Sequence, residues 1–206
     1  MTITTCRTVD TDSADETVVL SELLTLLARC FKRPDEQTAT ALSSDRLAEE
    51  IVSRGTSSGL IIEMPAPPDR PHQLYRRTFE AYDEGPYAPP AESVYKDWWD
   101  GTRRELLAGP PAHDMAARYE AVGMEIPPAY PADHIALLLE YSSLLLEERA
   151  FDEYLAFDEA HFDWIPQFRA RVERTSEVEF HHWAVAVLET VIEQTRSHVE
   201  TKNGEG

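Results

Sequence analysis

The sequence predicts a single all-α domain of about eight to ten helices, and three observations favour this fold class. Apolar residues recur at helical spacing along most of the chain. No segment alternates between apolar and polar residues for long enough to build a sheet, and no internal repeat is visible. With 206 residues, of which 42% are hydrophobic, the chain can bury a sizeable core. We expect the helical domain at residues 17–199, after a disordered segment at 1–16 and before a frayed tail at 200–206.

The first two predicted helices are bounded by residues that start or stop a helix. One helix carries the apolar residues from Val18 to Phe31 and ends before Pro34, which cannot continue it. A second helix begins at Ser43 or Ser44, whose hydroxyl can cap it, and ends at Gly55. Glycine is favoured there because the residue after a helix often adopts a left-handed conformation.

Proline marks the next two predicted helices. Pro71 fits the first turn of a third helix, where its missing N–H costs nothing. A proline-rich loop at residues 85–90 precedes a fourth helix, which carries Val94, Tyr95 and Trp98.

The second half of the chain is predicted to hold five further helices. A glycine follows the first of them, and a proline-stiffened connector at residues 126–131 leads to the second, which is long and mostly apolar. Ser176 with Glu179 forms a capping box for the last. The expected ranges are 113–122, 133–150, 151–162, 163–174 and 180–198.

The chain is strongly acidic, with 38 Asp and Glu residues against 19 Lys and Arg residues and a formal net charge of −19. This balance argues against nucleic acid binding, because phosphate contacts require a positive surface. It is typical either of a surface that stays hydrated in a salt-rich, halophilic cytoplasm or of a protein that attracts a cationic partner.

The sequence carries no signal for secretion or stable membrane insertion. No window approaches the roughly 18 uninterrupted apolar residues of a membrane span, and residues 1–16 lack the apolar region of a signal peptide. We therefore expect a cytoplasmic protein. Its two cysteines, Cys6 and Cys30, match no metal-binding spacing.

Polar residues gather where the long apolar helix is expected to begin. Pro131, Asp133 and His134 place a rigid turn, a carboxylate and an imidazole at its start. Groups at the mouth of a buried helix can be held in fixed geometry while facing outward, which suits recognition or chemistry. Asp133 has a simpler alternative role as a helix cap, and His134 as an ordinary surface residue.

None of the seven histidines forms a recognisable metal site. His181 and His182 are adjacent, so on a helix their side chains point about 100° apart. Asp133 and His134 have no further ligand one turn later, and no nucleophile motif or glycine-rich phosphate loop is present. We assign no catalytic residue, metal or cofactor, while a metal site built from distant helices stays open.

Two groups of aromatic residues are candidates for a binding surface. Tyr75 and Phe79 lie on one face of the third helix, where a core role competes with binding. Tyr95, Trp98 and Trp99 follow the proline-rich loop, and three rings there exceed what one helix face normally buries.

Taken in order, these segments resemble the TorD/DmsD/NarJ family of redox-enzyme maturation chaperones. The similarity runs from about residue 18 to residue 198 and rests on five motifs, each weak alone but specific in this order. They are Leu23–Phe31 followed by Arg33-Pro34, then Tyr75–Phe79, Pro89–Tyr95, Tyr119–Gly123 leading to Pro131–His134, and Phe162–Phe168.

The resemblance implies an all-helical fold, no catalysis, and binding of the twin-arginine leader of a molybdopterin oxidoreductase. The chaperone would hold the apo-form of the catalytic subunit until its cofactor is inserted, before export. By the same resemblance Pro131, Asp133 and His134 belong to the leader-binding motif, Ser93 and Tyr95 to the proline-loop motif, and Tyr75 and Phe79 to the aromatic motif.

Trp98 joins these candidates on physical grounds, because it or Tyr95 could stack on a leader arginine held by Asp133. One departure concerns Tyr130, which stands where the family signature has a glutamate and removes one expected carboxylate. Two other functions stay open. One is a helical metalloprotein or hydrolase that uses Asp133 and His134, and the other is a helical interaction module that is not a chaperone. A homodimer formed by helix swapping is also compatible with the sequence.

Overall fold

The computed structural model describes residues 15–81 and 85–204, and this part of the chain is all-helical, as predicted. It contains no strand, only one isolated bridge between Ala91 and His134. The helices are α1 (Glu16–Phe31), α2 (Glu36–Ser43), α3 (Arg46–Ser57), α4 (Pro71–Phe79), the 3₁₀ turn η1 (Glu92–Val94), α5 (Pro110–Val122), α6 (Ile135–Glu147), α7 (Phe151–His161), α8 (Ile165–Thr175) and α9 (Glu179–Gly204).

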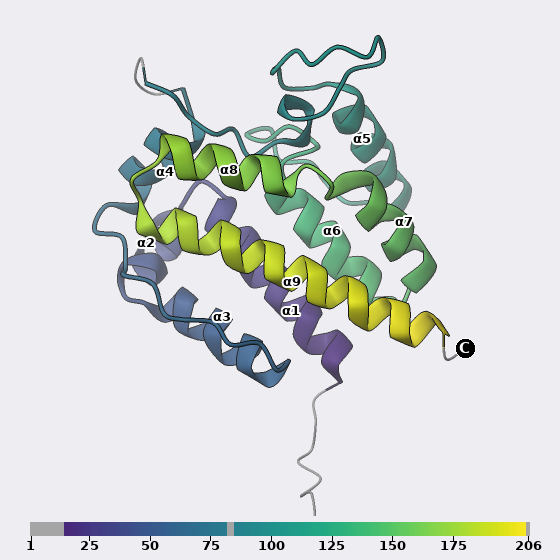
Figure 1. The fold of residues 1–206 in the computed structure, drawn as a ribbon, viewed down its shortest axis with the longest axis horizontal. Coiled ribbons are helices and arrows are strands. Elements are labelled where there is room, and N and C mark those ends of the chain that lie inside the picture. Colours follow the sequence, from purple (N-terminus) through teal and green to yellow (C-terminus); the bar gives the residue numbers. More distant parts are fainter. Residues whose placement is uncertain (1–14, 82–84, 205–206) are drawn as a thin grey trace, which may run out of the picture.

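Helix α1 lies at the centre and packs against α3, α6 and α9. Its start is capped by the Asp15 side chain, which accepts a hydrogen bond from the Thr17 N–H, and its end is set by Pro34. Figure 1 shows α9 (yellow) crossing the face of the molecule over α1 (purple), with α3 to one side and α6 on the other. The apolar residues of α1 are therefore buried against three neighbouring helices.

Helix α6 is the most deeply buried element. Ten of its 13 residues are buried, including serines as well as leucines, and it packs mainly against α1 and α7. A helix enclosed in this way is rigid, so the residues at its start are held by the core rather than by a surface loop.

An aromatic cluster joins the N-terminal and C-terminal halves of the chain. The Phe168 ring on α8 lies with its centroid 6.0 Å from that of Phe31, 6.1 Å from Phe79, 5.9 Å from Tyr95 and 5.5 Å from Trp164. Each pair is tilted or edge-on, a geometry that aromatic rings prefer. Phe168 thus connects α1, α4 and the segment after η1.

Helix α2 was not expected from the sequence, and it changes the neighbouring boundaries. Asp35 caps α2 by accepting from the Thr38 N–H at 2.7 Å, so Ser44 follows the end of α2 instead of opening the next helix. Gly55 does not end α3 either, because the helix continues to Ser57. Gly55 instead permits a close approach, since a Cβ at this position would lie 2.4 Å from the Ile62 side chain.

The prediction of a helix around Val94, Tyr95 and Trp98 is wrong. Only the short turn η1 forms, and the Trp98 N–H then donates to the Thr102 carbonyl, which reverses the chain. Gly101 lies inside this reversal at φ +72°, a conformation that favours glycine. The apolar residues in this segment are buried because the turn packs against the core, and not because they share one face of a helix.

The two ends of the chain also differ in part from expectation. Of the N-terminal segment expected to be disordered, residues 1–14 lie outside the described residues, and Glu16 already belongs to α1. At the other end α9 continues to Gly204, through most of the segment predicted to fray. None of the described helices is long and apolar enough to span a lipid bilayer.

Candidate functional site

Asp133 and His134 are buried, so the prediction that they face outward at the mouth of α6 is wrong. The Asp133 side chain is 0% exposed and His134 is almost fully covered. The chain before η1 lies over them, because the Glu92 N–H donates to the Asp133 carbonyl and the Ile135 N–H donates to the Pro90 carbonyl. Burial also removes the open coordination position that a hydrolytic metal site at these two residues would require.

His134, and not Asp133, caps α6. The His134 Nδ1 atom accepts a hydrogen bond from the Ala136 N–H at 3.2 Å, which requires a neutral ring with its hydrogen on the other nitrogen. Burial lowers the pKa of His134 to about 3, and the charge of Lys32 acts in the same direction. The Tyr130 ring covers one side of the imidazole at a centroid distance of 4.5 Å.

A His134→Asn variant should lose much of the acid sensitivity of the native chain. The unfolded chain protonates this histidine below about pH 6.5, whereas the folded chain resists protonation down to about pH 3, so native stability falls as the pH drops between these values. Asparagine caps helices well but does not titrate. Urea unfolding at about pH 6, 5 and 4 should show a slope smaller by about 1.4 kcal/mol per pH unit in the variant. Equal slopes would mean that His134 is not held neutral by the fold.

Asp133 forms a buried hydrogen-bonded pair with Ser93, which the sequence places 40 residues away. Its Oδ2 atom accepts from the Ser93 N–H at 2.6 Å and also from the Ser93 hydroxyl. Burial raises the pKa of Asp133, and the two hydrogen bonds from Ser93 partly offset this effect. The pair fixes η1 onto the start of α6.

Ser93 also ties together the two ends of a projecting loop. Its hydroxyl accepts from the Gly109 N–H at 2.9 Å, and its carbonyl accepts from the Trp98 indole N–H at 3.3 Å. Gly109 is required here, because a Cβ would lie 2.9 Å from the Trp98 ring. We call residues 96–108, which include Trp98 and end next to Gly109, the Trp99 loop.

The Trp99 loop displays apolar side chains to solvent. Trp99 is 70% exposed, Leu106 58% and Leu107 51%. Exposed apolar side chains gathered on one loop are a feature of interaction sites. Neither leucine was singled out from the sequence, although their position in a loop next to two tryptophans was the available signal.

The other predicted site residues divide between core and edge. Tyr95 is buried and stacks on Trp164 at 5.1 Å, and Tyr75 and Phe79 are buried 5.2 Å from each other, so all three are core residues rather than surface contacts. Pro131 and Trp98 are half-buried at the edge of the site. The structure therefore brings Ser93, Asp133 and Trp98 together and leaves Tyr75 and Phe79 apart, in the aromatic core.

A buried ionic cluster next to η1 was missed. Glu92 is almost fully buried, and its Oε2 atom lies 2.8 Å from Nδ1 of His161, whose Nε2 atom lies 2.9 Å from Asp114. Lys96 completes the cluster at 3.0 Å from Glu92 and 2.7 Å from Asp163. Burial raises the pKa of Glu92, while His161 and Lys96 oppose that change. No local signal reveals such a cluster, because its members come from η1, the Trp99 loop, α5, α7 and the segment after α7.

Neither a metal-binding cluster nor a reactive thiol is found among the described residues. Among them, no group of three His, Cys, Asp or Glu side chains is arranged to hold a metal ion. Burial raises the pKa of the Cys30 thiol to about 12, so this side chain is not a nucleophile at neutral pH. The site combines the buried Ser93–Asp133 pair with an exposed apolar loop.

Comparisons with known proteins bear on the family and the fold of this chain. The family model described as nitrate reductase delta subunit matches residues 34–173, which is more than half of the chain. A crystal structure from Archaeoglobus fulgidus, described provisionally as a redox enzyme maturation protein, is similar with a TM-score of 0.53 and 20% sequence identity, over 94% of this chain and 99% of that chain. No curated protein matches.

The family match thus places this all-helical chain among the NarJ/TorD-type maturation chaperones, which are not catalytic enzymes. The chain belongs to the nitrate reductase delta subunit family. The resemblance of its motifs to the TorD/DmsD/NarJ chaperones is confirmed.

Proposed function

We propose that this protein binds the twin-arginine leader of a molybdopterin oxidoreductase subunit in the cytoplasm. It would hold the apo-subunit until the cofactor is inserted, before export. The observation that carries this proposal is the Trp99 loop, which exposes Trp99, Leu106 and Leu107 from a rigid base. A leader contains an apolar stretch that needs such a surface while it is unfolded.

The charges of the loop favour an apolar occupant. Arg104 pairs with Asp100 inside the loop, and Glu105 lies 3.3 Å from Arg171 of α8. Because these charges are already paired, the loop offers mainly rings and aliphatic side chains to a partner. Desolvating such groups supplies binding free energy without leaving a charge buried and unpaired.

In this proposal the buried residues Asp133 and Ser93 position the loop. Asp133 holds Ser93, and Ser93 holds both anchors of the Trp99 loop, at Trp98 and Gly109. A preorganised loop loses less conformational entropy when a partner binds. The family motif would then act on the leader through the loop and not by direct contact.

A Trp99→Ser variant should bind a synthetic twin-arginine leader at least about 10-fold more weakly than the native chain, since exposed tryptophans at the centre of an interface often carry much of the affinity. Isothermal titration calorimetry measures this effect. The matched control is Ile61→Ser, which removes a side chain that is 99% exposed on a different loop. Equal losses in both variants, or none in either, would remove the Trp99 loop as the binding surface.

A further inference from the structure

The Trp99 loop has the chemistry of the segment that we propose it binds. Residues 102–107 read Thr-Arg-Arg-Glu-Leu-Leu, so the adjacent pair Arg103 and Arg104 is followed, after one residue, by two leucines. A twin-arginine leader likewise combines two adjacent arginines with apolar residues. The loop therefore carries both a surface for such a segment and a segment of the same kind.

Of the two adjacent arginine pairs in the sequence, only the pair in the loop lies beside exposed apolar residues. Every residue from Gly101 to Ala108 is exposed. The other pair, Arg76 and Arg77, belongs to α4, and the apolar residue that follows it, Phe79, is 3% exposed and packs in the aromatic core. The loop is therefore the place where this chain can present a leader-like segment to another molecule.

Two unusual backbone conformations frame the exposed leucines of the loop. Glu105, before Leu106, has a φ of +51°, and Ala108, after Leu107, has a φ of +63°. This left-handed conformation is unfavourable for a residue with a Cβ, so the anchors of the loop must hold it. Strain of this kind is concentrated at binding sites, which favours a binding role for the two leucines.

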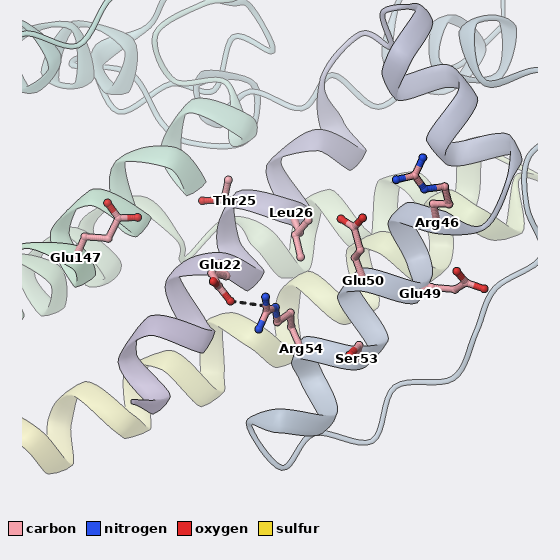
Figure 2. A pocket seen from close by; sticks show the side chains of 9 residues that line it. All are labelled: Glu22, Thr25, Leu26, Arg46, Glu49, Glu50, Ser53, Arg54 and Glu147. Carbon is pink, nitrogen blue, oxygen red and sulfur yellow. Dashed lines mark ion pairs between the residues drawn. The ribbon is translucent and has the colours of Figure 1, made fainter. Parts of the chain in front are cut away.

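The Trp99 loop is electrically neutral in an acidic molecule. Residues 96–108 contain three basic and three acidic side chains, whereas the whole chain has a net charge of −19. A groove of about 770 Å³ between α1 and α3 shows the contrast, because carboxylates outnumber guanidinium groups along it (Figure 2). Its charged lining residues are Glu22, Glu49, Glu50, Glu147, Arg46 and Arg54. Repulsion between two copies of this chain is therefore weaker at the Trp99 loop than at such a surface.

The charges of the loop are also self-complementary. Arg103 lies 3.8 Å from Asp97, too far for a hydrogen bond, and the two side chains are 45% and 62% exposed. One guanidinium nitrogen of Arg103 donates to Gln167 at 3.0 Å. Under a two-fold axis, Asp97 of each copy can face Arg103 of the other, because the same patch is used twice.

We propose that two copies of this chain bind each other transiently through their Trp99 loops. Leu106 and Leu107 of each copy lie against Trp99 of the other, and Asp97 of each copy lies opposite Arg103 of the other. One loop from each copy makes a small interface, below the size of stable complexes, so the contact is easily displaced.

The inference rests on the proposed function, because the client leader binds the same apolar side chains. A leader and a second copy therefore exclude each other. The free chaperone covers its apolar loop with a second copy and exposes the loop when a leader takes that place.

Sedimentation equilibrium of the full chain tests the contact. We expect a monomer–dimer equilibrium with a dissociation constant of about 10 to 100 µM, and monomers once a twin-arginine leader peptide is in excess. A Leu106→Ser, Leu107→Ser variant should associate at least about 10-fold more weakly. The matched control is Ile61→Ser, Met64→Ser, which removes two exposed apolar side chains from a different loop and should leave the equilibrium unchanged.

Charge reversal separates a contact between copies from a contact within one copy. Asp97→Arg alone and Arg103→Glu alone should each weaken self-association by about 5- to 10-fold, because like charges then face each other across the two-fold axis. An equimolar mixture of the two variants should restore association, since each reversed charge meets an opposite charge on the other variant. Mixing cannot restore a contact that lies within one copy.

A native chain that stays monomeric well above the expected dissociation constant would overturn the inference. A dimer that the leucine variant and the charge reversals leave intact would also overturn it, because another surface would hold the copies together. So would a dimer that binds the leader peptide without dissociating. In the first two cases calorimetric binding of the leader would leave the proposed function standing. A chain that dimerises through the loop but binds no leader would overturn the proposed function and support the contact between copies.

Discussion

A Phe168→Ala variant should be less stable to unfolding than the native chain by about 3–5 kcal/mol, the usual cost of deleting a buried phenylalanine ring. The side chain is fully buried, and four other aromatic rings surround it. Its loss would open a cavity between α1, α4 and α8, which a rigid helical core fills only in part. Urea unfolding followed by circular dichroism measures the change.

The control for this prediction is Phe168→Leu, which retains most of the apolar volume and should cost about 1–1.5 kcal/mol. The comparison separates the cavity from any change in helix propensity, because alanine and leucine both favour helices. An alanine variant as stable as the leucine variant would mean that the halves of the chain are not joined through this ring.

An Asp133→Ala variant should lose about 3 kcal/mol of stability, because it leaves the buried Ser93 N–H and hydroxyl without their acceptor. Asp133→Asn should lose much less, since an amide oxygen can accept from the Ser93 N–H and carries no charge to bury. The native carboxyl already resists ionisation, as its pKa is raised by burial.

Leader binding distinguishes the positioning role of Asp133 from a direct contact. If Asp133 acts through the loop, Asp133→Asn should bind a leader peptide nearly as well as the native chain, and Asp133→Ala should bind it more weakly. If Asp133 instead pairs with a leader arginine, both variants should lose affinity equally. Calorimetry at low salt would separate the two cases, because ionic contacts are strongest there.

Ser93, Asp133 and His134 have the chemistry of a ligand-binding site, although all three are buried. A carboxylate, a serine and an imidazole near prolines are residues that often contact ligands. Here Asp133 accepts hydrogen bonds from Ser93 and His134 caps α6, both inside the protein, while Ser93 also holds the loop that faces solvent. A motif can therefore mark a functional region while its members stay buried.

The sequence by itself determined those features that depend on neighbours along the chain. Apolar spacing identified eight of the nine α-helices in the described residues, and Pro34, Pro71 and Gly123 marked helix ends or starts that the structure confirms. The order of the motifs was also sufficient to identify the family. These signals are local because a helix forms its hydrogen bonds within about four residues.

Only the tertiary structure decided which polar groups reach solvent. Ser93 and Asp133 are 40 residues apart, and Glu92 and His161 are 69 apart, so no periodicity can show that each pair meets in the interior. The same contacts replaced the helix predicted around Tyr95 with a turn and left Trp99 exposed on a loop. The physical reason is that burial is set by distant segments packing together, and propensity along the chain does not contain that information.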